Sequence, residues 1–465
     1  MENQDWVQEF STFYKKQNLD HDIFEALDKL PRYVRIVGFN CRFSTSELGE
    51  NEFPGLYSGV NGVINNSETN NIEATASRSE LLMLEEYASQ LQSELNTAVT
   101  PRIDLSSAIA VSSLEIGSNN HILDLCCAPG GKLLMISDIF ARFGPPSEHT
   151  CGSISGVDIS PHRLSTCKSQ IKKSKSLGKI RIRLFLEDGT EFSTLPPADS
   201  WWDHSIRKNT PTSSSLETPK TPWFASKMLR TSTLSLSRHK DSKRAHFPSP
   251  KLYDKVLVDA ECTHDGSLVH LAKYTSQDPF SKLDSEFLSD ERVKNVSVLQ
   301  YSLLVNGWEL LEVGGVLIYS TCSLTPIQNE DVIAKFLYRS YMPFLEYINL
   351  INLGSESAII RSDVLNNTLQ SSLAGTSSLP NNACFLIPVI QYPSTSVLRT
   401  RLNISSVITD HLCSKSPKIP NRIISDLQKC FRLDPRFSDT SGMFIAKIRK
   451  EKMTIDEIVS FLSSV

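Results

Sequence analysis

The stretch HILDLCCAPGGK, His121 to Lys132, decides the fold. Its opening apolar run predicts a buried strand that ends near Asp124. The small residues Ala128 to Gly131 predict a tight turn into a helix that begins near Lys132. The spacing of the glycines fits neither the GxxxxGK[ST] phosphate loop nor the GxGxxG dinucleotide fingerprint. The stretch is therefore typical of a strand–turn–helix unit whose helix N-terminus faces a different kind of ligand.

Further strands and helices alternate after this unit. Because parallel strands need helical crossovers, the alternation predicts an α/β fold with a mostly parallel, doubly wound, Rossmann-like sheet. We expect the helix that begins near residue 296 to end at Gly314-Gly315. The predicted strands are 153–160, 179–188, 253–262, 316–324 and 442–450, and the predicted helices are 161–175, 296–315 and 329–341.

The rest of the chain divides into a smaller N-terminal region, two insertions and a tail. Residues 1–100 are predicted to be helical or α+β, and residues 101–450 form the main domain. Within 1–100 we expect helices in 1–30 and 78–95, a strand in LPRYVRI (30–36) and a loop at 44–75. The remaining expectations are a disordered basic insert at about 196–251, a Ser/Asn-rich insert at about 354–382, and a C-terminal helix or tail at 451–465.

Composition limits the class of protein. Hydrophobic residues make up 40 % and charged residues 22 %, and no apolar run approaches the roughly 20 residues of a membrane helix. The N-terminus lacks the pattern of a secretory signal, and the ten cysteines are scattered, so we expect reduced thiols in the nucleus or cytoplasm, with an organelle left open. The net charge of −4 combines −9 in residues 1–100 with +8 in residues 205–251. That basic segment is either a phosphate-binding surface or a solvated insert.

Polar residues stand at the carboxyl ends of the predicted strands, where open α/β sheets bind ligands. Asp158 is placed to hold ribose hydroxyls, and Asp188 lies where an adenine amino group would be. Together with the turn after the first strand, they favour a ligand that contains adenosine. Cys262 and Cys322 follow two further strands that should be neighbours. A single cysteine at such a place is usually an inert apolar residue, but two at adjacent strand ends suggest one reactive site.

In order along the chain, several motifs resemble the Sun-type RNA cytosine-C5 methyltransferases, which use S-adenosylmethionine. They are LPRYVRI, DLSSAIAV, LDLCCAPGGK, GVDIS, DKVLVDAEC, VGGVLIYSTCSLTPIQNED and SGMFIAKIRK, spread over about Pro31 to Lys450. The resemblance implies that Cys322 attacks the base, that Cys262 assists release, and that Lys132 and Asp259 approach the base. It implies a cofactor site formed by Cys126, Cys127, Ala128, Pro129, Gly130, Gly131, Lys132, Asp158, Arg163, Asp188 and Asp259.

Two thiols suit this chemistry. A thiolate that adds to C6 of cytosine makes C5 nucleophilic enough to take a methyl group. An acid near N3, Asp259, would stabilise the developing charge, and Cys262 would serve the elimination that frees Cys322. We expect Lys132 or the cofactor sulfonium to lower the thiol pKa. A paired base must be unstacked, so the expected substrate is a loop or a flipped nucleotide of tRNA or rRNA.

The sequence departs from the family at Glu261, where most members have proline. Two other classes of function therefore stay open beside the methyltransferase. One is a scaffold that binds S-adenosylmethionine and RNA but has lost activity. The other is a redox or zinc protein that uses Cys262, His264 and Cys126 or Cys127, although paired metal-ligand spacings are missing and His264 reads as a polar loop residue. We expect a monomer with no metal and no membrane partner.

Overall fold

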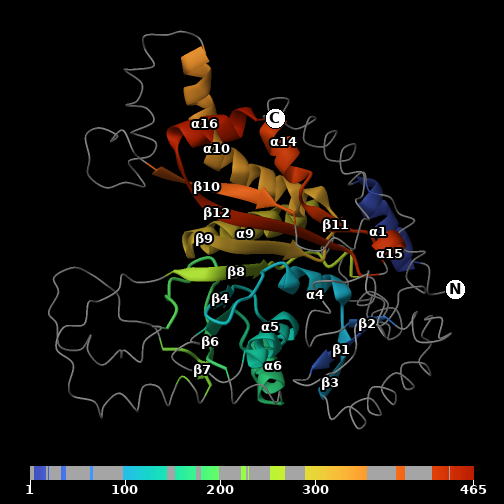
Figure 1. Cartoon of the computed structure of the whole chain (residues 1–465). Helices are drawn as coiled ribbons and strands as arrows, with labels where there is room; N and C mark the ends of the chain where they lie inside the picture. Colours follow the sequence, from blue (N-terminus) through green and yellow to red (C-terminus); the bar gives the residue numbers. More distant parts are fainter. Residues whose placement is uncertain are drawn as a thin grey trace, which may run out of the picture.

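The structure, a computed structural model, describes most of the main domain and short parts of the N-terminal region (Figure 1). The described residues are 5–16, 19, 33–37, 63–65, 98–143, 152–173, 180–197, 221–226, 229, 252–267, 289–352, 384–392, 421–438 and 440–464.

A nine-stranded sheet forms the centre of the molecule. Its order is β10-β12-β9-β8-β4-β5-β6-β7, with β11 paired to β12. The five strands β6-β5-β4-β8-β9 are parallel, and β12, β10, β11 and β7 run antiparallel to their neighbours. The prediction of a mostly parallel, doubly wound, Rossmann-like sheet is confirmed. The strands are β4 (His121–Asp124), β5 (Ser153–Asp158), β6 (Ile182–Leu186), β7 (Phe224–Ala225), β8 (Tyr253–Asp259), β9 (Leu311–Thr321), β10 (Cys384–Gln391), β11 (Phe431–Leu433) and β12 (Met443–Thr454).

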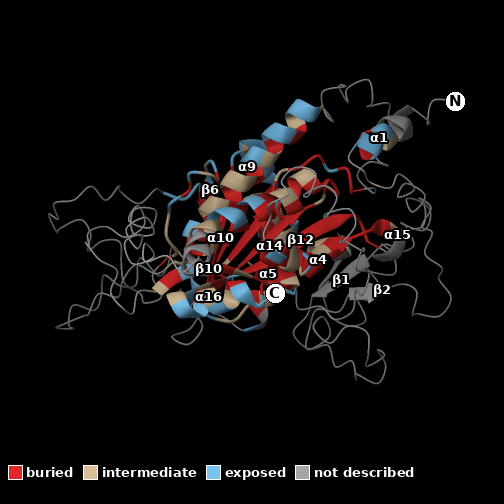
Figure 2. Ribbon diagram, turned by 90° about the horizontal axis from the view of Figure 1, so that it is seen from above, coloured by how far each residue is buried: buried red, intermediate tan, exposed pale blue. Residues whose placement is uncertain are grey.

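Two apolar cores, one on each face of the sheet, fix its position. Alternate side chains of a strand point to opposite faces, so Val256 and Val258 of β8 enter one core while Leu257 enters the other. Both faces are covered, and buried strands lie between the helices (Figure 2). Helices α9 (Asp290–Glu309), α10 (Glu330–Asn352), α14 (Asn421–Leu427) and α16 (Ile455–Ser463) pack on one face, and α4 (Leu105–Ser112), α5 (Gly131–Arg142) and α6 (Pro161–Lys173) pack on the other. Two short helical segments, η5 (Pro326–Gln328) and α15 (Pro435–Ser438), complete this part.

The N-terminal region contributes a helix and a separate antiparallel sheet. The helix is α1 (Asp5–Lys16), and the sheet has the order β2-β1-β3 with strands Val63–Asn65, Tyr33–Val37 and Ala98–Ile103. The predicted strand in LPRYVRI is confirmed. The predicted boundary after residue 100 falls within β3, whose pairing with β1 extends to Ile103. Asp104 follows this strand and caps α4 by accepting from the Ser106 N–H at 3.0 Å.

Three further expectations need correction. Residues 221–226 were expected to be disordered, yet β7 pairs with β6 and the Phe224 ring is buried. A loop was expected at 44–75, yet β2 lies within it. Helix α9 ends at Glu309, before the two glycines, because Gly314 and Gly315 belong to a bulge inside β9. Gly314 has a φ of +78°, which suits glycine.

Some expectations lie outside the described residues. These are the helix at 78–95, the Ser/Asn-rich insert at 354–382 and most of the basic insert. The predicted last strand and the helix after it are confirmed as β12 and α16. Among the described residues, no helix combines the length and apolar character needed to cross a membrane.

A buried ion pair ties the start of α10 to β11. Glu330 is fully buried, and Arg432 donates from Nε to its Oε1 at 3.0 Å and from Nη2 to its Oε2. Removing one partner of such a pair leaves an uncompensated buried charge, which costs about 3–5 kcal/mol. We therefore expect Arg432→Met to lower the free energy of unfolding by about that amount in a urea titration.

The matched control for this change is Arg449→Met. Arg449 pairs with Glu451 at 2.8 Å on the solvent-exposed part of β12. Exposed pairs of this kind contribute about 0–1 kcal/mol. Equal losses in the two variants would show that the Glu330–Arg432 pair does not anchor this part of the fold.

Candidate functional site

The site lies at the point where the strand order reverses. From β4 the chain builds β5 and β6 on one side, and later builds β8 and β9 on the other side. The carboxyl ends of β4 and β8 are therefore adjacent, with helices leaving them in different directions. Open α/β sheets bind ligands at this place. Asp124 ends β4 and Asp259 ends β8.

The two predicted thiols meet at this edge of the sheet. Cys262 lies three residues beyond β8, and Cys322 directly follows β9. Backbone bonds hold the two ends together: the Ala260 N–H donates to Ser320 O, and the Gly266 N–H donates to Cys322 O, each at 2.9 Å. The two Sγ atoms are 3.3 Å apart. The prediction that both cysteines face one site therefore agrees with their positions.

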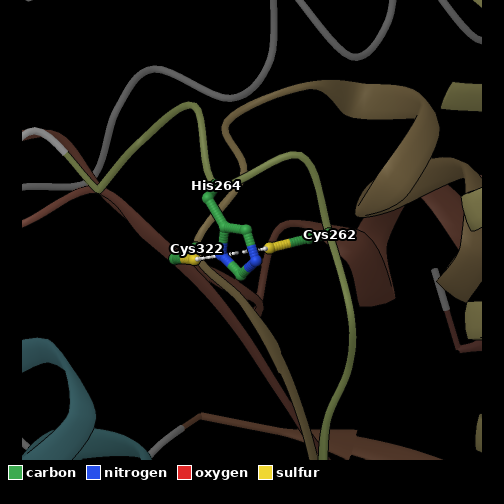
Figure 3. Close-up of side chains that lie close together, drawn as sticks. All are labelled: Cys262, His264 and Cys322. Carbon is green, nitrogen blue, oxygen red and sulfur yellow. Dashed lines mark hydrogen bonds between the residues drawn. The ribbon is translucent and has the colours of Figure 1, made fainter. Parts of the chain in front are cut away.

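His264, which the sequence analysis interpreted as a polar loop residue, lies between the two thiols. Its Nδ1 is 2.9 Å from Cys322 Sγ and 3.6 Å from Cys262 Sγ (Figure 3). The residue belongs to the same loop as Cys262 and has a φ of +53°. A histidine two residues after a cysteine was a visible signal. From the sequence, His264 was considered only for a redox or zinc site, and not as a partner of the nucleophilic thiol.

The pKa values of Cys262, His264 and Cys322 depend on one another. Burial opposes ionisation of Cys262, but hydrogen bonds with Cys322 and His264 outweigh it and lower the pKa of Cys262 to about 6. The hydrogen bond to Cys262 raises the pKa of His264 to about 9. The hydrogen bond to Cys262, followed by burial, raises the pKa of Cys322. At neutral pH the cluster therefore holds one thiolate beside an imidazolium, with one S–H proton left between the sulfurs.

Lys132 and Asp259 form an ion pair beside the thiols. Lys132 Nζ lies 2.7 Å from Asp259 Oδ2, and the Ser320 hydroxyl donates to Asp259 Oδ1 at 2.8 Å. Lys132 was expected to lower a thiol pKa, but its direct partner is this carboxylate. Burial, the largest single effect, lowers the pKa of Lys132, but the charge and hydrogen bond of Asp259 together with the charges of Cys322 and Asp124 outweigh it and raise the pKa. The pair offers an ammonium donor and a carboxylate to any ring that reaches the two sulfurs.

The turn after β4 forms the second half of the site. The Ala128 N–H donates to Asp158 Oδ2 at 3.2 Å, and Arg163 Nη2 donates to Ala128 O at 2.7 Å. Gly130 has a φ of +109°, and a Cβ there would lie 2.9 Å from Cys167 Sγ, so glycine is required. Gly130 caps α5 without a side-chain hydrogen bond, and a Cβ on Gly131 would meet nothing within 4 Å. The helix N-terminus is open to a ligand.

The other predicted cofactor residues differ in their surroundings. The thiols of Cys126 and Cys127 stay protonated because burial raises the pKa of each. Pro129 is exposed at the tip of the turn. Asp188 lies just beyond β6 and is exposed, and its Oδ1 accepts from the Thr190 N–H and hydroxyl at 2.8 Å. Asp188 therefore shares the sheet edge but is joined to its own turn.

A buried hydrogen-bond network behind the thiols was also missed. Gln328 donates from Nε2 to the hydroxyls of Thr263, Ser323 and Thr325 and accepts from the Thr263 N–H at 3.1 Å. This network links the loop that carries Cys262 to the segment after Cys322. Tyr14 of α1 reaches the same loop, since its hydroxyl lies 3.0 Å from Asp265 O. Nothing in residue spacing alone indicated this contact, which spans 251 positions.

Within the described residues, one group of side chains is close enough to hold a metal ion. The potential ligand atoms of Cys262, His264 and Cys322 all lie within 4.8 Å of one another. Cys126 and Cys127, which the zinc hypothesis included, are not part of this group. The absence of a metal stays a prediction.

Comparisons with known proteins agree with this site. The sheet order and the site at its switch point have the arrangement of a Rossmann-like, class I methyltransferase fold. The family model of the 16S rRNA methyltransferase RsmB/F matches residues 227–358, which include Asp259, Cys262 and Cys322. That segment is similar to the RsmB/F family, and the curated relatives are named as tRNA or rRNA cytosine-C5 methyltransferases, so the resemblance inferred from the motifs is confirmed.

Two curated relatives show how far the similarity extends. Ribosomal RNA small subunit methyltransferase B of Pseudomonas syringae pv. tomato is 24 % identical over 237 residues, 51 % of this chain and 36 % of the relative. The tRNA (cytosine(34)-C(5))-methyltransferase of Drosophila melanogaster is 25 % identical over 358 residues, 73 % of this chain and 35 % of the relative. The chain therefore spans about a third of the length of these relatives. The solved structure of NSun6 from Pyrococcus horikoshii covers 96 % of this chain with 15 % identity and a TM-score of 0.42, and 98 % of that structure is covered.

Proposed function

We propose that the protein transfers a methyl group from S-adenosylmethionine to C5 of a cytosine in RNA. The observation that carries this proposal is the pair of sulfurs 3.3 Å apart, next to the Lys132–Asp259 ion pair, at the switch point of the sheet. Covalent attack and release each need a thiol, and the ring needs both a donor and a carboxylate at its edge. All four groups converge at this place.

The residues after β4 fit S-adenosylmethionine. Three carboxylates, Asp124, Asp158 and Asp259, lie around the turn, and Lys132 is paired with Asp259. Crowding of the three carboxyl groups raises the pKa of Asp124, and a ligand that carries positive charge, such as a sulfonium with an ammonium group, would relieve this crowding. The open N-terminus of α5 favours the ligand's carboxylate. Asp158 and Arg163 hold the turn in place through their hydrogen bonds with the backbone of Ala128.

The proposed roles of the side chains follow from their contacts. Cys322, the less buried thiol, adds to C6 of cytosine. Lys132 and Asp259 orient the ring and stabilise the charge that develops at its N3 edge. S-adenosylmethionine supplies the methyl group that C5 takes up. Cys262 then assists loss of the C5 proton, the electron pair of the C6–S bond returns to Cys322, and the ring regains its double bond.

The substrate is proposed as tRNA or rRNA, because the relatives carry names of both kinds. The N-terminal region is the candidate for RNA binding, since α1 contacts the loop of Cys262 through Tyr14. We propose that the protein acts as a monomer in the nucleus or cytoplasm. An organelle is a further proposal, since one relative is named a mitochondrial tRNA methyltransferase of Mus musculus.

The test of this function uses the purified full chain with S-adenosylmethionine and total tRNA or rRNA. Nucleoside mass spectrometry should detect new 5-methylcytosine that depends on the protein. Cofactor binding by calorimetry without any methyl transfer would instead favour the inactive scaffold. Binding of neither cofactor nor RNA would contradict both readings.

Cofactor binding should depend on pH through Asp124. Burial, followed by the nearby charge of Asp259, raises the pKa of Asp124 to about 8. Below that pH the carboxyl holds a proton that a cationic ligand must expel, whereas above it the carboxylate is ready. The affinity for S-adenosylmethionine should therefore rise between pH 6 and 8, by up to about tenfold per unit, and level off above 8. Calorimetry in buffers of different ionisation enthalpy should detect the released proton.

The control for this prediction is Asp124→Asn, which cannot titrate. Its affinity should change less with pH over the same range, because only the ligand's own amino group then contributes. Equal proton release in the wild-type protein and Asp124→Asn would show that Asp124 does not respond to the cofactor.

A further inference from the structure

Glu261 and His264 lie on either side of Cys262 in one loop, and their side chains approach each other. Glu261 stands where the family usually has proline, and His264 follows three residues later in ECTHDG. His264 Nε2 is 3.9 Å from Glu261 Oε1. The opposite ring nitrogen, Nδ1, is 2.9 Å from Cys322 Sγ. The imidazole therefore connects a carboxylate to the nucleophilic sulfur.

Both ends of this arrangement are held in place. Glu261 Oε2 is 3.5 Å from Arg163 Nη1, and the Glu261 carbonyl accepts from Gln300 Nε2 at 2.7 Å. On the other side, Asp265 Oδ2 accepts from the Leu324 N–H at 2.9 Å. These contacts fix the backbone on each side of His264.

The backbone of His264 itself is in the left-handed region, with a φ of +53°. That conformation is uncommon for a residue with a side chain, and it persists where the surroundings impose it. Here it directs the imidazole towards the sulfurs, as Figure 3 shows.

We propose that His264 is a catalytic base that converts the Cys262–Cys322 pair into a thiolate, and that Glu261 is a positioning residue that orients His264. The S–H proton passes to Nδ1, and its electron pair stays on sulfur. The product is a thiolate beside an imidazolium. The proton shared by the two sulfurs then decides which of them carries the charge. While Cys322 is bound to C6, Cys262 loses its proton to water and then takes the proton from C5. When Cys322 leaves C6 as a thiolate, the original pair is restored, so His264 is unchanged over one turnover.

The use of the thiolate rests on the proposed function, whereas its formation is a property of the free protein. The charged and titratable groups that face the imidazole are Cys262, Cys322, Glu261 and Asp265. Arg163 acts on Glu261, and Lys132 and Asp259 act on Cys322. Hydrogen bonds and charge on the cysteines and Glu261 favour the imidazolium, in agreement with the raised pKa of His264.

The test measures how fast iodoacetamide alkylates Cys262 and Cys322 as a function of pH, with EDTA present and the peptides resolved by mass spectrometry. His264→Asn keeps a polar side chain that tolerates the left-handed conformation but cannot accept the proton. If the apparent pKa rises from about 6 to the 8.5 of a free thiol, the thiolate fraction of the charged thiol at pH 7 falls roughly thirtyfold, and the midpoint of the alkylation profile should move up by the same shift. An unchanged pH profile would overturn the proposal.

Two further variants separate a chemical role from a structural one. In His264→Gly, added imidazole should restore the alkylation rate at pH 7, which a packing defect would not permit. Glu261→Gln should shift the profile in the same direction by a smaller amount, and should have no further effect in the His264→Asn background. If the effects of Glu261→Gln and His264→Asn add, Glu261 does not act through His264.

The control variant is His162→Asn, on the exposed side of α6, which should leave the profile unchanged. Because no RNA is present, this experiment is independent of methyl transfer. If the protein shows the expected pH profile of alkylation but never methylates RNA, the proposed function is wrong and the role of His264 as a base still holds.

Discussion

Replacing Cys322 with alanine is expected to abolish methyl transfer to RNA. Without the sulfur, nothing adds to C6, and C5 stays too weak a nucleophile for the methyl group. The rate of 5-methylcytosine formation should fall at least about a thousandfold, the scale of losing a covalent nucleophile. Cofactor binding, measured by calorimetry, should persist because Cys322 follows β9 and none of its hydrogen bonds goes to the turn after β4.

The matched control is Cys384→Ala, which removes another half-buried cysteine that is in no disulfide, in β10 at the far edge of the sheet. Its methylation rate should equal that of the wild-type protein. A Cys322→Ala protein that methylates cytosine at the normal rate would refute the covalent mechanism.

Replacing Cys262 with alanine is expected to make a covalent RNA–protein adduct accumulate, whereas the Cys322→Ala protein forms no bond to RNA. His264 Nδ1 contacts Cys322 directly at 2.9 Å, so the nucleophile keeps its base when Cys262 is lost. Attack and methylation then proceed, but the step that removes the C5 proton lacks its thiol. A band of protein linked to RNA should appear on a denaturing gel, while turnover falls to a single event.

The double variant Cys262→Ala/Cys322→Ala should form no such band, because the adduct needs Cys322. Normal turnover by Cys262→Ala, without an adduct, would remove Cys262 from release. An adduct in the double variant would place the bond on another residue.

The sheet and the two thiols could be predicted from sequence because both depend on local patterns. Alternating apolar residues fix which face of β8 is buried, and parallel strands bring their carboxyl ends to one edge, so Cys262 and Cys322 had to be close. The residues at which helices and strands end were harder to predict from the sequence. Gly314-Gly315 is a strong helix-end signal, but pairing with β8 kept it inside β9 as a bulge.

The role of His264 could not be predicted, because it depends on the direction of one side chain. A φ of +53° is set by contacts on either side of the loop, among them those of Glu261 with Gln300 and of Asp265 with Leu324. The contact of Tyr14 with Asp265 is equally non-local. Such contacts join distant segments, and spacing along the chain carries no trace of them.

The Cys322–C6 bond is tested most directly by RNA in which cytosine is replaced by 5-fluorocytosine. In this base, fluorine replaces the C5 hydrogen that must be removed as a proton before the C6–S bond can break. The wild-type protein should therefore stay attached to the methylated base. After digestion with nuclease and protease, mass spectrometry should place the nucleotide on the peptide that contains Cys322. A nucleotide on Cys262, or rapid formation of 5-methylcytosine in ordinary RNA with no trapped adduct in the substituted RNA, would contradict the mechanism.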